Sequence, residues 1–103
     1  MTRATFYIRN NQPCGFVIDG HSGYAEHGQD IICAAISSAA YMAVNTITEI
    51  IGADVEADVK DGYMKIMLGS TSKAATDILK GLQLHLSELA KDNPDFIEIT
   101  TEV

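Results

Sequence analysis

An uncharged run of eighteen residues, Ile31 to Thr48, constrains the fold of this chain more than any other segment. Its length approaches that of a membrane-crossing helix. Polar side chains interrupt it at Ser37, Ser38, Asn45, Thr46 and Thr48. No cluster of Lys or Arg flanks it, although such clusters are typical of membrane helices. The run therefore predicts a buried core helix, and we expect no membrane contact.

Two residues mark the predicted limits of this helix. Asp30 occupies an N-cap position, where a carboxylate accepts hydrogen bonds from backbone N–H groups. Gly52 follows the last apolar residue, as glycine often does at a helix C-terminus. Apolar residues recur between them at Ile31, Ala34, Ala35, Ile36, Ala39, Met42, Ala43, Ile47, Ile50 and Ile51. This spacing predicts a long central helix with these residues in the core.

Length and charge limit the class of protein. The chain of 103 residues is 47% hydrophobic, which predicts one domain over residues 1–103 that needs neither metal nor disulfides. Fourteen acidic against seven basic residues give a net charge of −7. Direct binding of nucleic-acid phosphates is therefore not expected, whereas a basic partner is favoured. The polar first ten residues lack the apolar core of a signal peptide, so we expect a cytoplasmic protein with reduced thiols.

Two short strands and a glycine-bearing loop precede the central helix. Residues 5–9 and 14–18 alternate apolar and polar side chains around a polar turn at 10–13. Four of the eight glycines fall within fourteen residues, at Gly15, Gly20, Gly23 and Gly28. The segment 20–29 is therefore predicted to be a mobile loop, and such loops often carry function.

Asp61 and Gly62 predict a second hairpin with a two-residue turn. Its register pairs Val59 with Met64, Ala57 with Ile66 and Val55 with Leu68, so all six are expected on one buried face. On the opposite face Asp58 lies across from Lys65, and this opposite-charge pair supports the register independently.

The last third of the chain predicts a helix and a final strand. Residues 70–72 offer caps, Asp92-Asn93-Pro94 ends the helix, and residues 96–103 alternate as a strand. The apolar stripe consists of Ala75, Ile78, Leu79, Leu82, Leu86 and Leu89. The predicted fold is α+β, with the element order ββαββαβ and a mainly antiparallel sheet of about five strands covered by two helices.

Cys33 is the first candidate for a catalytic residue. It lies three residues after Asp30, where the helix dipole and unpaired N–H groups stabilise a thiolate. Such a position lowers the pKa of a cysteine, whereas burial in an apolar wall raises it. A small buried cysteine packed beside Ile32 and Ile36 is the structural alternative.

His21 is the candidate general base, because a short segment after the second predicted strand leads it toward the start of the helix. An imidazole near the sulfur takes the thiol proton and later protonates the leaving amine. Asp30 can cap the helix, and it can also orient His21 as a third catalytic group, because the two roles are compatible. Ser37 lies one turn beyond Cys33, either near the reacting sulfur or bonded back to the Cys33 carbonyl. A solvated surface histidine is the structural alternative for His21.

A metal site and nucleotide chemistry have little support. His21, His27 and Cys33, with Asp19, are suitable zinc ligands by type. Their spacing matches neither a helical i, i+4 pair nor a CxxC knuckle, so no metal is expected. His85 and Cys14 are interpreted as structural. No Walker loop, GxGxxG or GxSxG motif occurs in the sequence, and no cofactor is expected.

The string Asp19-Gly20-His21, followed by Gly28-Gln29-Asp30-Ile31-Ile32-Cys33-Ala34-Ala35-Ile36-Ser37, resembles the ribosomal-processing cysteine protease family, Prp. The resemblance includes the spacing of histidine and cysteine, the later Val44-Asn45 and the closing FIEI strand, so it spans essentially the whole chain. Ser22 departs from the family, in which alanine is common after the histidine.

The resemblance implies a cytoplasmic endopeptidase that removes a short N-terminal extension from protein twenty-seven of the large ribosomal subunit. It implies Cys33 as nucleophile, His21 as base, and a homodimer. It also implies an extended substrate with an aromatic residue before the cut, for which an exposed strand edge is a candidate dock. Backbone N–H groups at the helix start are candidate donors to the oxyanion. The substrate loop would include Gly20, Ser22, Gly23 and Gly28.

Two other classes of function stay open. A non-catalytic, ribosome-associated binding module would keep the fold and the acidity but tolerate loss of the Cys33 thiol. A thiol redox sensor would couple oxidation of Cys33 to a change of state.

Overall fold

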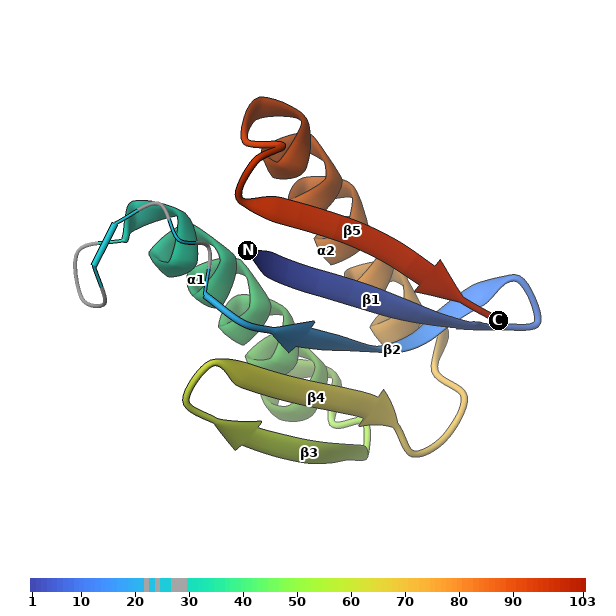
Figure 1. Ribbon diagram of the computed structural model, residues 1–103. Coiled ribbons are helices and arrows are strands. Elements are labelled where there is room, and N and C mark those ends of the chain that lie inside the picture. Colours follow the sequence, from blue (N-terminus) through green and yellow to red (C-terminus); the bar gives the residue numbers. More distant parts are fainter. Residues whose placement is uncertain (22, 24, 27–29) are drawn as a thin grey trace.

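The computed structural model describes residues 1–21, 23, 25–26 and 30–103 (Figure 1). Its elements are β1 (Thr2–Arg9), β2 (Gln12–Asp19), α1 (Ile31–Asn45), the π-helical η1 (Thr46–Ile51), β3 (Val55–Lys60), β4 (Tyr63–Leu68), α2 (Lys73–Asp92) and β5 (Ile97–Glu102). This order confirms the α+β prediction and its sequence of strands and helices.

The five strands form one sheet in the order β3-β4-β2-β1-β5. Three neighbouring pairs are antiparallel, and β5 is parallel to β1. Both helices lie behind the sheet in Figure 1, so they cover one of its faces. The sheet is therefore mainly antiparallel, as predicted. Its one parallel strand is β5, which follows α2 and lies at an edge.

The first hairpin turns more tightly than predicted. Asn10 and Asn11 adopt φ values of 54° and 63°, in the left-handed region that asparagine tolerates better than most residues. Such a two-residue turn matches the twist of the strands. Pro13 therefore belongs to β2, where it pairs with Ile8 at a shift in register.

The second hairpin has the predicted register, including Asp58 opposite Lys65. The predicted burial of its six apolar residues is wrong for two residues of β3, whereas Val55 and Leu68 are partly buried against the core. Met64 and Ile66 of β4 are buried, whereas Ala57 is exposed and Val59 is 46% exposed. The reason is the strand order: β3 is the edge strand, and it packs against the core only where it begins, at Val55.

The central helix is a core helix on one face only. Its buried residues are Ile32, Ile36, Ala40, Ala43 and Ile47. Ile31, Met42 and Ile50 of the predicted stripe are exposed by 65%, 62% and 81%. This helix carries apolar residues on all of its sides, so their spacing alone could not identify the side that packs against the sheet. The helix reaches Gly52 as predicted, where φ is 75°, but its last six residues are π-helical.

By length and composition alone, the segment Ile31–Ile51 could cross a membrane. Its most apolar window has a mean hydropathy of 1.5, and 28% of that window is buried. The prediction of no membrane contact relied on the polar interruptions and the missing basic flanks, but the polar residues leave the mean hydropathy of the segment as high as that of a membrane-crossing helix. Core helices of soluble proteins can be equally long and apolar, and the buried face of this helix packs in the hydrophobic core.

The second helix follows its prediction closely. The Ser72 hydroxyl accepts the Ala75 N–H at 3.2 Å, and Ala75, Thr76, Leu79, Leu82 and Leu86 are buried. On its exposed side, Lys73 binds Asp77 and holds the pKa of that carboxyl below its usual value. Across β1 and β5, Glu98 binds Arg3 at 2.6 Å and raises the pKa of the guanidinium.

Candidate active site

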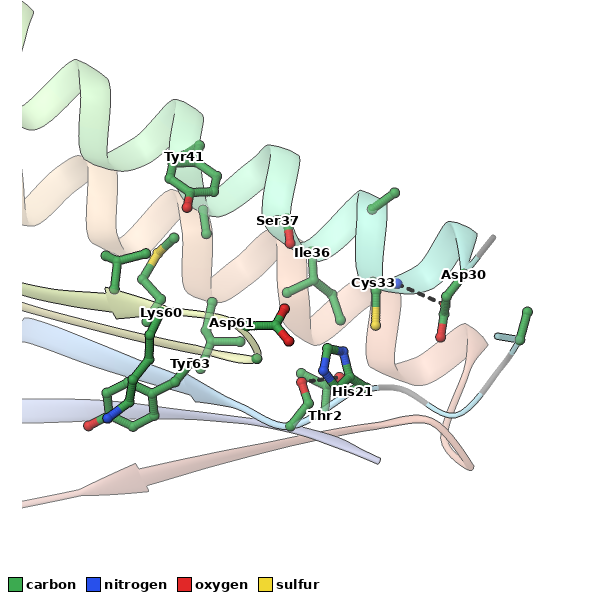
Figure 2. A pocket seen from close by; sticks show the side chains of 18 residues that line it. Thr2, His21, Asp30, Cys33, Ile36, Ser37, Tyr41, Lys60, Asp61 and Tyr63 are labelled. Carbon is green, nitrogen blue, oxygen red and sulfur yellow. Dashed lines mark hydrogen bonds between the residues drawn. The ribbon is translucent and has the colours of Figure 1, made fainter. Parts of the chain in front are cut away.

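A cavity of about 500 Å³ opens where the end of β2, the start of α1 and the β3–β4 turn meet (Figure 2). Its apolar wall includes Ile18, Ile36, Ala40, Val59 and Met64. Its polar lining includes Thr2, His21, Asp30, Cys33, Ser37, Lys60 and Asp61. The cavity therefore combines an apolar surface with a thiol, an imidazole and carboxylates.

Asp30 is the N-cap of α1, as predicted. Its Oδ1 accepts hydrogen bonds from the backbone N–H groups of Ile32 and Cys33, both at 3.0 Å. The side chain is held in place because Asp30 is only 8% exposed. The Ala34 N–H donates to the Asp30 carbonyl at 3.0 Å. These three N–H groups already have acceptors, so an oxyanion would compete with Asp30 for them, and their role as oxyanion donors stays a prediction.

Cys33 lies in the first turn of α1 with a half-buried side chain. Figure 2 shows its sulfur directed into the cavity toward the imidazole of His21. The alternative of a cysteine sealed within an apolar wall does not describe this position, since the thiol lines an open cavity. A thiol there can meet a substrate carbonyl.

His21 follows β2 by two residues and is exposed. The intervening Gly20 has φ +91°, which redirects the chain at the end of the strand. Its N–H donates to the Gly62 carbonyl at 2.8 Å, and its carbonyl accepts the Thr2 hydroxyl at 3.4 Å. These two bonds fix the backbone just before His21 and bring the imidazole to the same cavity as Cys33.

Ser37 is exposed one helical turn beyond Cys33 and also lines the cavity. Of the predicted substrate loop, Gly20 lines the cavity, and Gly23 has φ +79°. Ser22 and Gly28 lie outside the described residues, as does His27 of the metal alternative. Among the residues that are described, no three His, Cys, Asp or Glu side chains lie close enough to hold a metal ion.

Cys14 and His85 lie outside this cavity. The Cys14 thiol donates to the Tyr7 carbonyl at 3.4 Å within the first hairpin. His85 is exposed on α2 and lines a separate groove between the two helices. Their surroundings agree with a structural interpretation of Cys14 and a surface position for His85.

The β3–β4 turn is the part of the cavity that sequence reasoning missed. Lys60, Asp61, Gly62 and Tyr63 all line it, and the Lys60 ammonium lies 5.0 Å from the centre of the Tyr63 ring. The Asp61–Gly62 pair was recognised only as a turn. Pairing of β2 with β4 places this turn beside Gly20, and that pairing connects segments far apart in sequence.

Comparisons with known proteins identify the family. Residues 1–98 match the family model described as cysteine protease Prp. The ribosomal processing cysteine protease Prp of Bacillus subtilis (strain 168) is 26% identical over 95 residues, which cover 85% of each chain.

Solved structures share the fold over nearly the whole chain. The essential ribosomal processing protease Prp from S. aureus, in complex with a covalently linked product peptide, has a TM-score of 0.93 at 21% identity and covers 99% of this chain and 100% of that chain. SMU.848 from Streptococcus mutans has a TM-score of 0.78 at 30% identity, covering 99% and 96%. With the match to the family model, these relatives show that the chain belongs to the cysteine protease Prp family.

Proposed function

We propose that this cysteine protease removes the N-terminal extension from the precursor of protein twenty-seven of the large ribosomal subunit, with Cys33 as nucleophile and His21 as base. The observation that carries the proposal is the Cys33 thiol directed toward the His21 imidazole in one open cavity. Relatives named for ribosomal processing support the substrate class. A net charge of −7 favours encounter with a basic ribosomal protein.

The chemistry follows from the two side chains. His21 accepts the thiol proton, and the Cys33 sulfur attacks the scissile carbonyl carbon. The C–N bond then breaks, the leaving amine takes the proton from His21, and the acyl group stays on sulfur as a thioester. Water attacks the thioester while His21 accepts its proton. That proton returns to sulfur, and a carboxylic acid product leaves with the thiol restored.

The apolar wall of the cavity is suited to an aromatic side chain before the cut. Ile36, Ala40 and Met64 are buried core residues whose surfaces reach this cavity. Burial of an aromatic ring there contributes to binding the residue whose carbonyl is attacked. The exposed edge strand β3 borders the same cavity through Val59 and Lys60, and it is the candidate dock for an extended substrate.

The proposal includes a homodimer in the cytoplasm. Met42 is 62% exposed and lines the groove between α1 and α2, which offers an apolar surface that a second copy would cover. Sedimentation of the purified protein tests this part. A single species of twice the chain mass supports it, and a monomer at all concentrations contradicts it.

The test of function is the intact mass of the ribosomal precursor after incubation with the protein. Loss of the N-terminal extension with the natural protein, but not with folded Cys33→Ala or His21→Ala, supports the proposal. Cys14→Ala is the matched control and should cleave normally, because its thiol lies in the first hairpin. An intact precursor that nevertheless forms a complex would point to a binding module. Oxidation of Cys33 coupled to a change of state, without cleavage, would point to a redox sensor.

A further inference from the structure

The tip of the β3–β4 hairpin lies against the imidazole of His21. A methyl group added at Gly62 would lie 3.0 Å from Nε2 of His21, 3.5 Å from Cε1 and 3.6 Å from Cδ2. A separation of 3.0 Å is closer than carbon normally approaches a ring atom. A methyl group at Gly62 would therefore push against the ring, which would have to shift by a few tenths of an ångström.

The backbone of Gly62 also holds the chain directly before His21. The Gly62 carbonyl accepts the Gly20 N–H at 2.8 Å, directly before the histidine. The adjacent ladder pairs Asp19 with Tyr63, so the turn is held in register with the end of β2. Gly62 is thus joined by a backbone hydrogen bond to Gly20, the residue before His21, and also lies close to the His21 ring.

We propose that Gly62 is a positioning residue for His21, which sets the place of the imidazole relative to the Cys33 thiol. This inference rests on the proposed function, in which His21 is the base. Proton transfer depends steeply on the distance between the two groups, and a displacement of about 1 Å costs on the order of 100-fold in rate. A shift of a few tenths of an ångström should therefore be measurable.

Several charged groups share the cavity and bear on any pH measurement there. Asp61, on the same turn, points its carboxylate into the cavity, and Asp30 lies at the start of α1 (Figure 2). Cys33 faces His21 from α1, and the Lys60 ammonium lies over the Tyr63 ring. A substitution at Gly62 changes none of these charges, so a change in titration would report a change in position.

The chain supplies a matched control for the substitution. Gly62 has φ +70° and Gly52 has φ +75°, so alanine is strained in a similar way at both positions. A methyl group at Gly52 would meet nothing within 4 Å. The difference between Gly62→Ala and Gly52→Ala therefore isolates the contact with His21 from the strain in the backbone.

Three readouts test the inference on the full-length protein. We expect Gly62→Ala to lower kcat/KM for precursor cleavage about tenfold, and Gly52→Ala to stay within about twofold of the natural protein. We also expect Gly62→Ala alone to shift the imidazole NMR signals of His21 and the pH profile of Cys33 alkylation by iodoacetamide. If Gly62→Ala gives the same result as Gly52→Ala in all three measurements, the inference is wrong. Should Gly62→Ala fail to fold, Gly62→Asn and Gly52→Asn form the second pair, because asparagine adopts positive φ more readily.

The measurements separate this inference from the proposed function. Failure of the natural protein to cleave the precursor would contradict the function, whereas the NMR and alkylation results would still decide whether Gly62 positions His21. Normal cleavage by both variants, with unchanged His21 signals, would support the function and overturn the positioning role.

Discussion

The carboxylate of Asp30 accepts a hydrogen bond from the backbone N–H of Cys33 at 3.0 Å. The same oxygen accepts the Ile32 N–H, so one buried carboxylate defines the first turn of α1. The thiol is thereby placed at the cavity by the residue that starts its helix. The hydrogen bond that caps the helix is therefore also the one that holds the backbone of the proposed nucleophile.

Loss of this cap should destabilise the protein. We expect Asp30→Ala to lower the free energy of unfolding by about 1 kcal/mol, because two N–H groups lose their acceptor. Asp30→Asn should retain most of the stability, since an amide oxygen caps equally well. Urea unfolding followed by circular dichroism measures both. Ser72→Ala removes the cap of α2 and is the control for cap loss away from the cavity. Equal stability of Asp30→Ala and the natural protein would show that the cap contributes little.

Gly20 should tolerate alanine less well than Gly52 does. A methyl group at Gly20 would lie 2.7 Å from the Met1 carbonyl oxygen, a backbone atom that cannot rotate away. With φ +91° adding strain, we expect a loss of roughly 1–3 kcal/mol in unfolding free energy. Urea midpoints of Gly20→Ala and Gly52→Ala provide the comparison. A smaller loss at Gly20 than at Gly52 would contradict the contact with Met1.

An aromatic residue before the cut should matter to the rate. Burying its ring against the apolar wall contributes about 1.5–3 kcal/mol, which corresponds to roughly 10- to 150-fold in kcat/KM. The measurement compares two precursor peptides that differ only by Phe or Ala at that position. A Leu peptide is the control for apolar surface without a ring. Equal rates for the Phe and Ala peptides would show that this wall does not bind the residue.

The two cysteines should differ in reactivity. The Cys33 thiol lines an open cavity, whereas the Cys14 thiol donates to the Tyr7 carbonyl within the sheet. We expect iodoacetamide to label Cys33 several-fold faster, as measured by peptide mass mapping over time. The same measurement after urea unfolding, where both thiols are equally accessible, is the control. Faster labelling of Cys14 in the folded protein would contradict this difference in access.

Features that depend on neighbours in sequence could be predicted. Asp30 identified the start of α1, and Asp61-Gly62 defined the β3–β4 register, because capping and two-residue turns are local. Cys33 and His21 were likewise singled out by their places beside a cap and a strand end. For each of these residues, the type of residue and its close neighbours in the sequence were enough for the prediction.

Features that depend on strand order could not be predicted. The exposure of Val59 follows from β3 being an edge strand, and the contact of Gly62 with His21 follows from β4 lying beside β2. The exposed side of α1 depends on which of several apolar faces meets the sheet. Each arises from pairing or packing between distant segments, which alternation and helical spacing do not specify.

The role of Cys33 as nucleophile can be tested by trapping the acyl-enzyme that it would form. A precursor peptide is mixed with the protein, quenched in acid at short times, and the intact protein mass is measured. We expect a transient adduct on the natural protein whose mass is that of the N-terminal fragment minus one water. Peptide mapping should locate it on Cys33, and it should form on Cys14→Ala but not on Cys33→Ala. Cleavage that continues in folded Cys33→Ala, with no adduct on the natural protein, would show that Cys33 is not the nucleophile.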